Sequence, residues 1–167
     1  EFLTFYDPAL RKSLGVFYTP VQAVQYLISA VDKILVEDFN IEGGLSNNEQ
    51  ITTKVPCAPY KVTRTKWSSE MTISVPRVAI LDPACGTGSF GSEIIKYIKN
   101  TYFSGARSAF YENYIQQENG LLSRLIGFEI MMTSYVVAHL KIRRTIDETL
   151  GHLPTVQLPT NIFLTNT

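Results

Sequence analysis

A carboxylate followed by a glycine-rich loop lies near the centre of this 167-residue chain. The apolar residues Val78-Ala79-Ile80-Leu81 precede the nonapeptide Asp82-Pro83-Ala84-Cys85-Gly86-Thr87-Gly88-Ser89-Phe90. Gly86 and Gly88 permit backbone conformations, and a close approach to a ligand, that a side chain would prevent. Asp82 repels phosphate, and no Gly-Lys-Ser/Thr of a phosphate-binding loop follows. The loop therefore suits a ligand that is cationic or rich in hydroxyl groups.

The segments around this loop indicate a parallel sheet. Residues 78–81 predict a short buried strand, and apolar residues at helical spacing predict a helix over 90–99. Leu125-Ile126-Gly127-Phe128-Glu129 predicts a second strand, which also ends in a carboxylate and precedes a helix over 132–150. Residues 161–165 predict a third strand. This order is typical of a doubly wound α/β sheet, which binds ligands at the carboxyl ends of its strands.

Three polar side chains would then meet at that edge of the sheet. Asp82 suits an ammonium group, and Glu129 is placed to accept hydrogen bonds from ribose hydroxyls. Asn166, at the end of the third strand, can form hydrogen bonds with the edge of an adenine ring. S-adenosylmethionine, whose methionine part carries an ammonium and whose sulfur is a sulfonium, fits the ligand that Asp82 favours, and we predict it as the cofactor.

A long amphipathic helix is expected near the N-terminus. Thr19 is predicted as its N-cap and Pro20 as its first residue. Its apolar face would consist of Val21, Val24, Leu27, Ile28, Val31, Ile34 and Leu35. The aromatic pair Phe17-Tyr18 either fastens this helix to the core or belongs to the ligand site.

Residues 40–76 are rich in turn formers and prolines, and we expect a peripheral β-hairpin there. Met71, Ile73 and Val75 alternate as one strand, and residues 61–67 would pair with it around Ser68-Ser69. Lys61, Arg64 and Lys66 form a basic cluster near Trp67. Contact with DNA is one interpretation of this cluster, but a solvated strand face is favoured.

Helical spacing places several other side chains. We expect Phe110, Tyr114 and Ile115 in the core, because aromatic residues at such spacing usually pack inside. His139 would be half-buried on the apolar face of the helix over 132–150. Residues 141, 143 and 144, all basic, would be solvated.

Composition limits the class of protein. Apolar residues make up 45% and charged residues 18%, which is typical of a globular domain. No stretch is apolar enough to span a membrane. Two cysteines, Cys57 and Cys85, favour a reducing cytoplasm, although a disulfide between them is an alternative. No His/Cys cluster has the spacing of a metal site. With 15 basic and 15 acidic residues the chain is neutral, so we expect other segments to supply most of any contact with double-stranded DNA.

The nonapeptide from Asp82 to Phe90 resembles the first cofactor motif of amino-methylating DNA methyltransferases. Gly15-Val16-Phe17-Tyr18-Thr19-Pro20 resembles their motif X. With residues 6–11, 125–141 and 162–167, these motifs look most similar to N6-adenine DNA methyltransferase modules of type ISP, single-chain restriction–modification enzymes. The resemblance implies a partial Rossmann-like S-adenosylmethionine-dependent methyltransferase fold, with its first three strands preceded by an N-terminal helical segment.

The resemblance also implies roles for individual residues. Phe17, Tyr18 and Thr19 would line the methionine end of the cofactor, and Ile130 would flank its adenine. The family often has an aspartate where Asn166 stands. The cofactor site is thus expected to comprise Phe17, Tyr18, Thr19, Asp82, Ala84, Cys85, Gly86, Gly88, Phe90, Glu129, Ile130 and Asn166.

The catalytic motif of that family is absent from the 167 residues. The family uses Asn-Pro-Pro-aromatic after a fourth strand, where the Asn and a proline carbonyl bind the adenine amine and the aromatic ring stacks on the flipped-out base. No Asn-Pro-Pro occurs here. We therefore expect a fragment of a larger restriction–modification polypeptide, with residues 78–81 on an open sheet edge. Alone, it should hold no catalytic residue, bind cofactor weakly and methylate nothing.

We divide the chain into an N-terminal segment (1–39), an irregular or hairpin insertion (40–77) and the first half of a cofactor domain (78–167). Three alternatives to adenine methylation remain. The first is a non-catalytic cofactor-binding or assembly module that needs a partner. The second is half of a nicotinamide-dependent oxidoreductase, and the third is part of a cytosine-N4 methyltransferase. The carboxylate of Asp82 disfavours the dinucleotide of the oxidoreductase.

Overall fold

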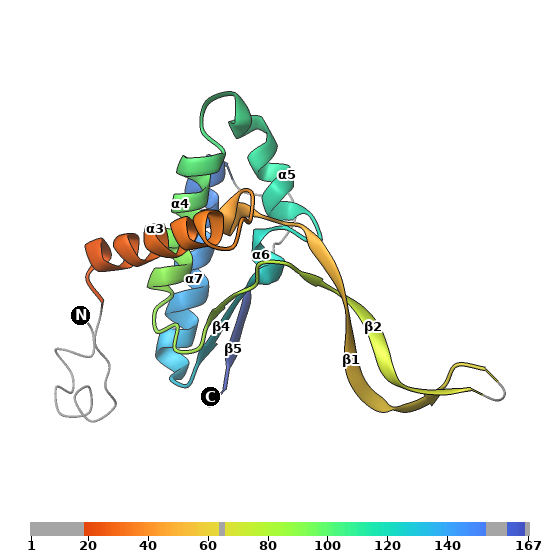
Figure 1. The fold of residues 1–167 in the computed structure, drawn as a ribbon. Helices are drawn as coiled ribbons and strands as arrows, with labels where there is room; N and C mark the ends of the chain where they lie inside the picture. The colour runs from red at the N-terminus through yellow and green to blue at the C-terminus, as the bar shows by residue number, and fades with distance from the viewer. Residues whose placement is uncertain (1–18, 64–65, 153–159, 166–167) are drawn as a thin grey trace.

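The computed structural model describes residues 19–63, 66–152 and 160–165. Helices and a small parallel sheet form the body, and a two-stranded antiparallel ribbon projects from it (Figure 1). In chain order the elements are α3 (Val21–Glu37), η1 (Gly44–Ser46), β1 (Gln50–Lys61), β2 (Trp67–Pro76), β3 (Ile80–Asp82), α4 (Ser89–Tyr102), η2 (Gly105–Phe110), α5 (Tyr111–Gln116), α6 (Leu121–Arg124), β4 (Leu125–Glu129), α7 (Met132–Leu150) and β5 (Asn161–Leu164).

The sheet of the body has the order β3-β4-β5, and all three strands run parallel. This confirms the expected succession of three neighbouring strands. β4 and α7 have the expected bounds, and Gly151 ends α7 in the left-handed conformation with φ of 79°. β3 begins two residues later than expected, at Ile80, because its partner strand β4 begins at Leu125, opposite Ile80. The carbonyl of Val78 accepts a hydrogen bond from Arg124.

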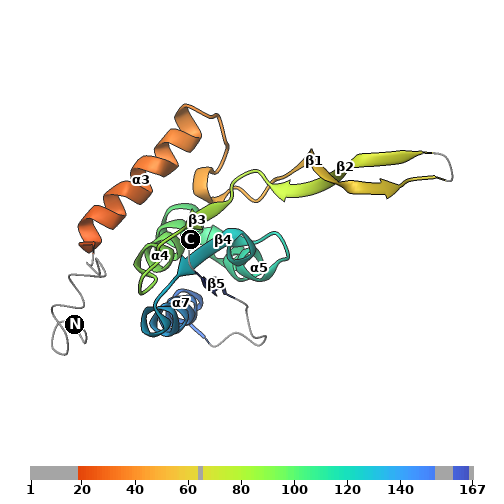
Figure 2. The ribbon, with the colours of Figure 1, turned by 90° about the horizontal axis from the view of Figure 1, so that it is seen from below.

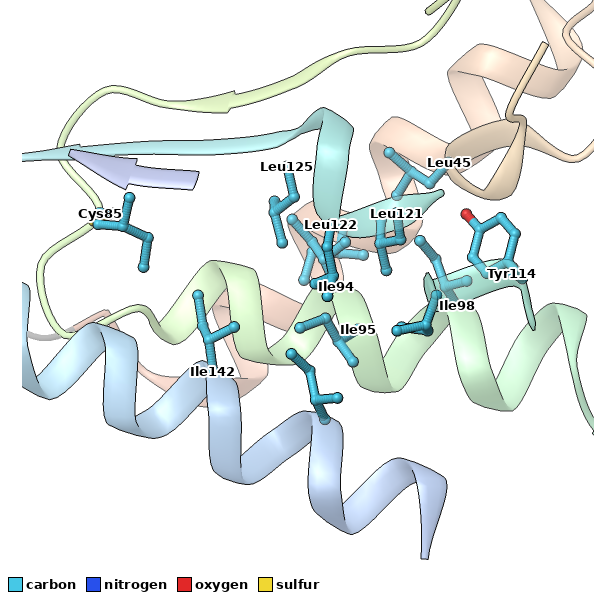
Figure 3. Close-up of a cluster of buried hydrophobic side chains, with 14 of the residues drawn as sticks. Leu45, Cys85, Ile94, Ile95, Ile98, Tyr114, Leu121, Leu122, Leu125 and Ile142 are labelled. Carbon is cyan, nitrogen blue, oxygen red and sulfur yellow. The ribbon is translucent and has the colours of Figure 1, made fainter. Parts of the chain in front are cut away.

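The core lies between one face of this sheet and helices α4 and α7 (Figure 3). It includes Ile94, Ile95 and Ile98 from α4 and Ile142 from α7. The other face of the sheet is apolar but is left open by the described residues, where Leu81 is 56% exposed and Phe163 49%. A doubly wound sheet covers both faces with helices, so the described residues account for one half of that arrangement.

Helix α3 lies apart from the sheet (Figure 2). Of its expected apolar face, only Val24 and Ile28 are fully buried, whereas Val21, Leu27, Val31 and Ile34 are each close to half exposed. The expected buried face was therefore too wide, because α3 packs chiefly on α4 and η1. The expected cap is also wrong: α3 begins at Val21, Pro20 occupies the N-cap position, and no side chain bonds to it.

A buried carboxylate fastens α3 to the body. Asp32 is 5% exposed and accepts hydrogen bonds from the hydroxyls of Tyr97 (2.9 Å) and Tyr102 (2.7 Å) on α4. It also accepts the backbone N–H of Leu45 at 2.7 Å. Gly44 has φ of 47°, and a Cβ there would lie 2.2 Å from the Asp32 carboxylate. The hydrophobic pattern of α3 does not predict this anchor.

Arg124 is a second buried polar junction, at 1% exposure. Its guanidinium donates to the carbonyls of Leu45 (2.6 Å) and Val78 (3.2 Å) and to the Tyr114 hydroxyl. It thereby joins the segments on both sides of the ribbon to the start of β4.

The aromatic segment before β4 differs from the expectation at one position. Tyr114 and Ile115 are buried as expected, but Phe110 is 67% exposed and Tyr111 is buried in its place. The reason is that Phe110 ends a 3-10 helix, and α5 begins only at Tyr111.

A hairpin is present within residues 40–76, but its strands differ from the expected ones. β1 and β2 pair from Gln50 opposite Pro76 to Lys61 opposite Trp67, and Ser68-Ser69 lie within β2 instead of at the turn. The register shifts between Pro56 and Tyr60. Proline lacks the N–H that a ladder requires, which explains the irregularity at Pro56 and Pro59.

Candidate functional site

Two carboxylates lie at the carboxyl edge of the parallel sheet. Asp82 ends β3 and pairs in register with Gly127, two residues before Glu129 at the end of β4. Since side chains alternate along a strand, Asp82 and Glu129 lie on the same face of the sheet. The structure thus brings together the two acidic residues that the sequence analysis selected.

The Asp82 carboxylate is poorly satisfied. One oxygen accepts the backbone N–H of Ala84 at 3.3 Å, and the other is buried without a hydrogen-bond partner among the described residues. Burial raises the pKa of Asp82 above its usual value, and the charge of Glu129 adds to the effect, although the bond from Ala84 opposes it. A buried carboxylate oxygen without a donor is a site at which a cationic or hydroxyl-bearing ligand would be stabilised.

Glu129 is held by the chain that follows it. The side chain is 8% exposed and accepts the backbone N–H of Met131 at 2.7 Å. Its own carbonyl accepts the N–H of Thr165, which fastens the end of β5 beside it. The sequence analysis did not anticipate the contact with Met131, which results from the sharp turn between β4 and α7.

The loop from β3 to α4 contains two glycines with different surroundings. Both have positive φ, 54° at Gly86 and 74° at Gly88. A Cβ at Gly88 would lie 3.2 Å from Ala138 of α7, whereas a Cβ at Gly86 would meet nothing within 4 Å. Gly88 therefore serves helix packing, and Gly86 leaves open space beside the carboxylates.

Cys85 lies in this loop but turns its side chain into the core. Its backbone N–H donates to the carbonyl of Phe128 at 2.9 Å, and its sulfur would lie 3.2 Å from a Cβ at Gly127. Burial, with the charges of Asp82 and Glu129, raises the pKa of Cys85 to about 11. The thiol stays protonated at neutral pH, so only the backbone of Cys85 is suited to bind a ligand.

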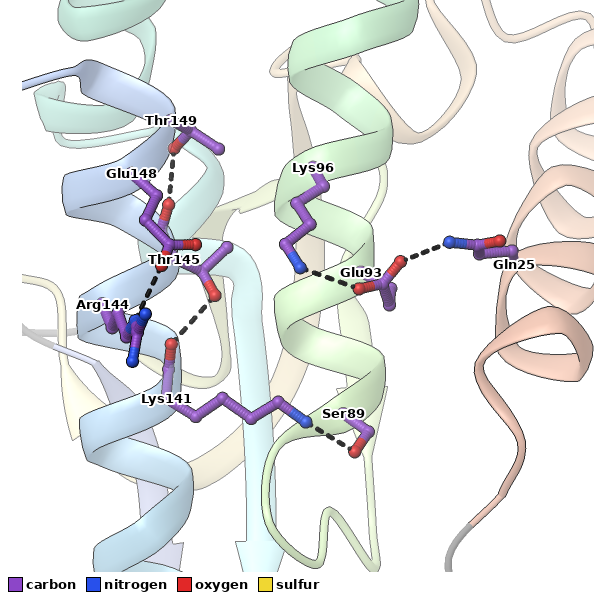
Figure 4. Close-up of polar contacts among 9 residues, drawn as sticks. All are labelled: Gln25, Ser89, Glu93, Lys96, Lys141, Arg144, Thr145, Glu148 and Thr149. Carbon is purple, nitrogen blue, oxygen red and sulfur yellow. Dashed lines mark hydrogen bonds and ion pairs between the residues drawn. The ribbon is translucent and has the colours of Figure 1, made fainter.

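A polar cluster holds the first turn of α4 (Figure 4). Lys141 of α7 donates to the Ser89 hydroxyl at 2.9 Å, and Glu93 accepts from Lys96 (3.0 Å) and from Gln25 of α3 (2.8 Å). Burial and nearby Lys96 lower the pKa of Lys141. The expectation that Lys141 is solvated is therefore wrong, because the close packing of α4 and α7 draws its ammonium to the loop.

The remaining predicted site residues divide into three groups. Phe17, Tyr18 and Asn166 lie outside the described residues. Ala84, Thr19 and Ile130 are exposed, Ile130 at 65%. Phe90 is half-buried and packs against the core. It also lines a groove between α3 and β3, together with Leu27, Val31 and Leu81. Phe90 thus lies on the groove side of α4.

The glycine spacing alone leaves a dinucleotide ligand open. Gly86, Gly88 and Gly91 have the spacing Gly-x-Gly-x-x-Gly of dinucleotide-binding loops. A Cβ at Gly91 would lie 2.9 Å from Ile142, so this third glycine permits helix packing. The carboxylate of Asp82 at the strand end is the feature that opposes a diphosphate.

Among the described residues, no group of three or more His, Cys, Asp or Glu side chains is arranged to hold a metal ion. None of their helices combines the length and apolar character needed to span a membrane.

No family model and no curated protein matches this chain. Several solved structures do, among them the following three. The chain aligns with a DrdV–DNA complex determined by cryo-electron microscopy at 26% identity and a TM-score of 0.60, over 98% of this chain and 11% of that one. It aligns with the ATP-dependent type ISP restriction–modification enzyme LlaBIII bound to DNA at 22% identity and a TM-score of 0.59, over 89% of this chain and 8% of that one. It also aligns with a nuclease-deletion mutant of the type ISP enzyme LlaGI, in complex with a DNA substrate mimic, at 22% identity and a TM-score of 0.58.

The chain shares its fold with part of these enzymes. The alignment with LlaGI includes 98% of this chain but only 10% of LlaGI. The chain therefore spans about a tenth of the length of the proteins that it resembles. The matches to LlaBIII and LlaGI, at 22% identity, concern the fold alone. In the fold, they agree with the type ISP resemblance of the sequence motifs.

Proposed function

We propose that this chain is the cofactor-binding N-terminal part of an adenine-specific (N6) DNA methyltransferase module within a restriction–modification enzyme. The observation that carries the proposal is the placement of Asp82 and Glu129 on the same face of a parallel sheet, beside a loop whose Gly86 faces open space. The structural likeness to restriction–modification enzymes supports the context. In this proposal, the three parallel strands and the helices between them form part of a Rossmann-like methyltransferase fold.

The residues present fit S-adenosylmethionine. The unpartnered oxygen of Asp82 would accept a hydrogen bond from the ammonium of the methionine moiety, and Glu129 from the ribose hydroxyls. The backbone of residues 84–88 would lie against the cofactor, because Gly86 has no Cβ to hold it away. When bound, the cofactor supplies a methyl group activated by the sulfonium.

The residues of this chain bind and orient, and none is placed to activate adenine. The 167 residues contain no Asn-Pro-Pro sequence, so the groups that would hold the adenine amine belong to other residues of the proposed enzyme. The chain alone is therefore expected to bind cofactor without transferring the methyl group. In such a division of roles, positioning of the reacting atoms supplies much of the rate.

Calorimetric titration of the purified chain with S-adenosylhomocysteine and, separately, with NADH tests the proposal. We expect S-adenosylhomocysteine to bind and NADH to bind far more weakly, because Asp82 repels the diphosphate. Glu129→Gln should weaken binding about tenfold or more, the loss typical of a hydrogen bond to a charged group. Glu148→Gln, at an exposed residue paired with Arg144, is the matched control and should not change binding. Equal affinity for NADH, or no effect of Glu129→Gln, would contradict the proposal.

A second candidate function, that of an assembly module without chemistry of its own, is favoured by the open edge of the sheet. Among the described residues β3 pairs only with β4, and Leu81 beside this edge is 56% exposed. An exposed hydrophobic edge strand is a ready site for pairing with another segment. A stable one-to-one complex with a partner chain that forms no methyltransferase would favour this candidate over the first.

A further inference from the structure

The ribbon of β1 and β2 is the part of the molecule that the proposed cofactor site does not use. It projects from the body, and its two strands contact chiefly each other (Figures 1 and 2). An ion pair of 2.7 Å between Arg77 and Glu49 closes its base. At about 3.3 Å per residue, the 12 residues of β1 extend roughly 35–40 Å.

The ribbon does not bury enough surface to be stable by itself. Ile51 is 42% exposed and Met71 45%, and both belong to cross-strand pairs that in a larger sheet would be covered. An isolated two-stranded hairpin is at best marginally stable in water. A surface that covered the ribbon would therefore stabilise it.

Charge is segregated onto this ribbon. Residues 50–76 contain four basic residues and one acidic residue, which gives a net charge of +3 in a chain whose total is zero. The acidic residue is Glu70, whose carboxylate Oε2 lies 4.0 Å from the Lys54 Nζ within the ribbon. The basic side chains near the tip are thus not compensated by an acidic residue of the ribbon, and the remainder of the chain carries the opposite charge.

The described part of the tip combines cations with an aromatic ring. Lys61 and Trp67 face each other in register, and the Lys61 ammonium lies 5.4 Å from the centre of the Trp67 ring, which is 59% exposed as a residue. Lys66 is exposed, and its carbonyl accepts the N–H of Val62 at 2.9 Å, which closes the turn. The charged atoms of Lys61 and Lys66 are therefore carried at the far end of the projection.

We propose that the tip of this ribbon, with Lys61, Lys66 and Trp67, contacts the phosphate backbone of double-stranded DNA. A two-stranded ribbon has the dimensions to enter a major groove, and lysines supply phosphate contacts that position a protein without reading its sequence. The inference rests on the DNA context of the proposed function, but it concerns a surface separate from the cofactor site. It assigns to this neutral chain a DNA contact of its own.

The single tryptophan of the chain is Trp67, so its fluorescence reports on the ribbon directly. The chain, without cofactor, is titrated with a fluorescein-labelled duplex at several low salt concentrations, and anisotropy and Trp67 emission are both followed. We expect binding that weakens with salt and a change in Trp67 emission at saturation. Lys61→Gln/Lys66→Gln should reduce the slope of log K against log salt by about 2, since each phosphate contact contributes about 0.9.

The matched control is Lys33→Gln/Arg144→Gln, which removes the same charge from two exposed helical residues. The slope measured for this control should differ from that of the unmodified chain by less than about half a unit. Equal slopes for the two double variants, or Trp67 emission that saturating duplex leaves unchanged, would overturn the proposal. A response of Trp67 to poly-glutamate but not to duplex would also overturn it, in favour of an acidic protein partner. The measurement contains no cofactor, so its outcome is independent of whether the proposed cofactor site binds S-adenosylmethionine.

Discussion

Asp82 and Glu129 end adjacent parallel strands on one face of the sheet, and burial, with a smaller contribution from the charge of Glu129, raises the pKa of Asp82. Two carboxylates in this arrangement destabilise each other unless a cation or a hydrogen-bond donor comes between them. The loop that follows β3 leaves space for such a group beside Gly86. Stability and ligand binding should therefore respond in opposite directions when this charge is removed.

Replacing Asp82 by asparagine should stabilise the unliganded chain and weaken its binding of S-adenosylhomocysteine. Because the pKa of Asp82 is higher in the folded than in the unfolded chain, its ionisation costs stability as pH rises above its usual value of 3.8. The benefit of Asp82→Asn should thus be absent near pH 3 and reach about 1 kcal/mol at pH 7, the low end of the cost of an unpaired buried polar group. Thermal unfolding at a series of pH values measures it. A benefit independent of pH would contradict this account.

The two loop glycines should separate binding from stability. Gly86→Ala places a methyl group in open space and should cost about 1 kcal/mol of stability through its positive φ alone, while impairing cofactor binding. Gly88→Ala adds a 3.2 Å contact with Ala138 and should cost more stability. Gly105→Ala, with φ of 58° and open surroundings far along the chain, controls for backbone strain. If Gly86→Ala and Gly105→Ala bind S-adenosylhomocysteine with the same affinity, no ligand lies against this loop.

The two cysteines should differ in reactivity. With its pKa raised to about 11 from an ordinary 9.0, Cys85 has roughly 100-fold less thiolate near neutral pH than an unperturbed thiol. Cys57 is half-buried on the ribbon. Alkylation with iodoacetamide at pH 8, followed by mass spectrometry, should therefore modify Cys57 first and Cys85 only after denaturation. Early modification of Cys85 in the folded chain would contradict the structure of the loop.

The anchor of α3 should make a large contribution to stability. Tyr102→Phe removes one hydrogen bond to the buried Asp32 carboxylate and should cost about 1.5–3 kcal/mol. Tyr26→Phe, on the same helix as Asp32 but 71% exposed, should change stability by less than about 0.5 kcal/mol. Urea unfolding compares the two. A similar effect of both substitutions would show that the hydroxyl of Tyr102 is not held as described.

The sequence by itself determined the features that depend on neighbouring residues. Alternation and helical periodicity predicted β4 and α7 with their bounds, and the strand-loop-helix order predicted three adjacent parallel strands. It also singled out Asp82 and Glu129, because parallel strands present their carboxyl ends at one edge. These predictions succeed because they depend on local backbone preferences and on a strong rule of sheet topology.

Only the tertiary structure decided which faces are covered and which polar groups meet. The apolar pattern of α3 is the same whether or not a partner covers it, and α4 leaves most of that face exposed. The bonds from Tyr97 and Tyr102 to Asp32, the burial of Arg124 and the approach of Lys141 to Ser89 each join residues far apart in the chain. No local pattern encodes such contacts, because they depend on how complete elements pack against one another.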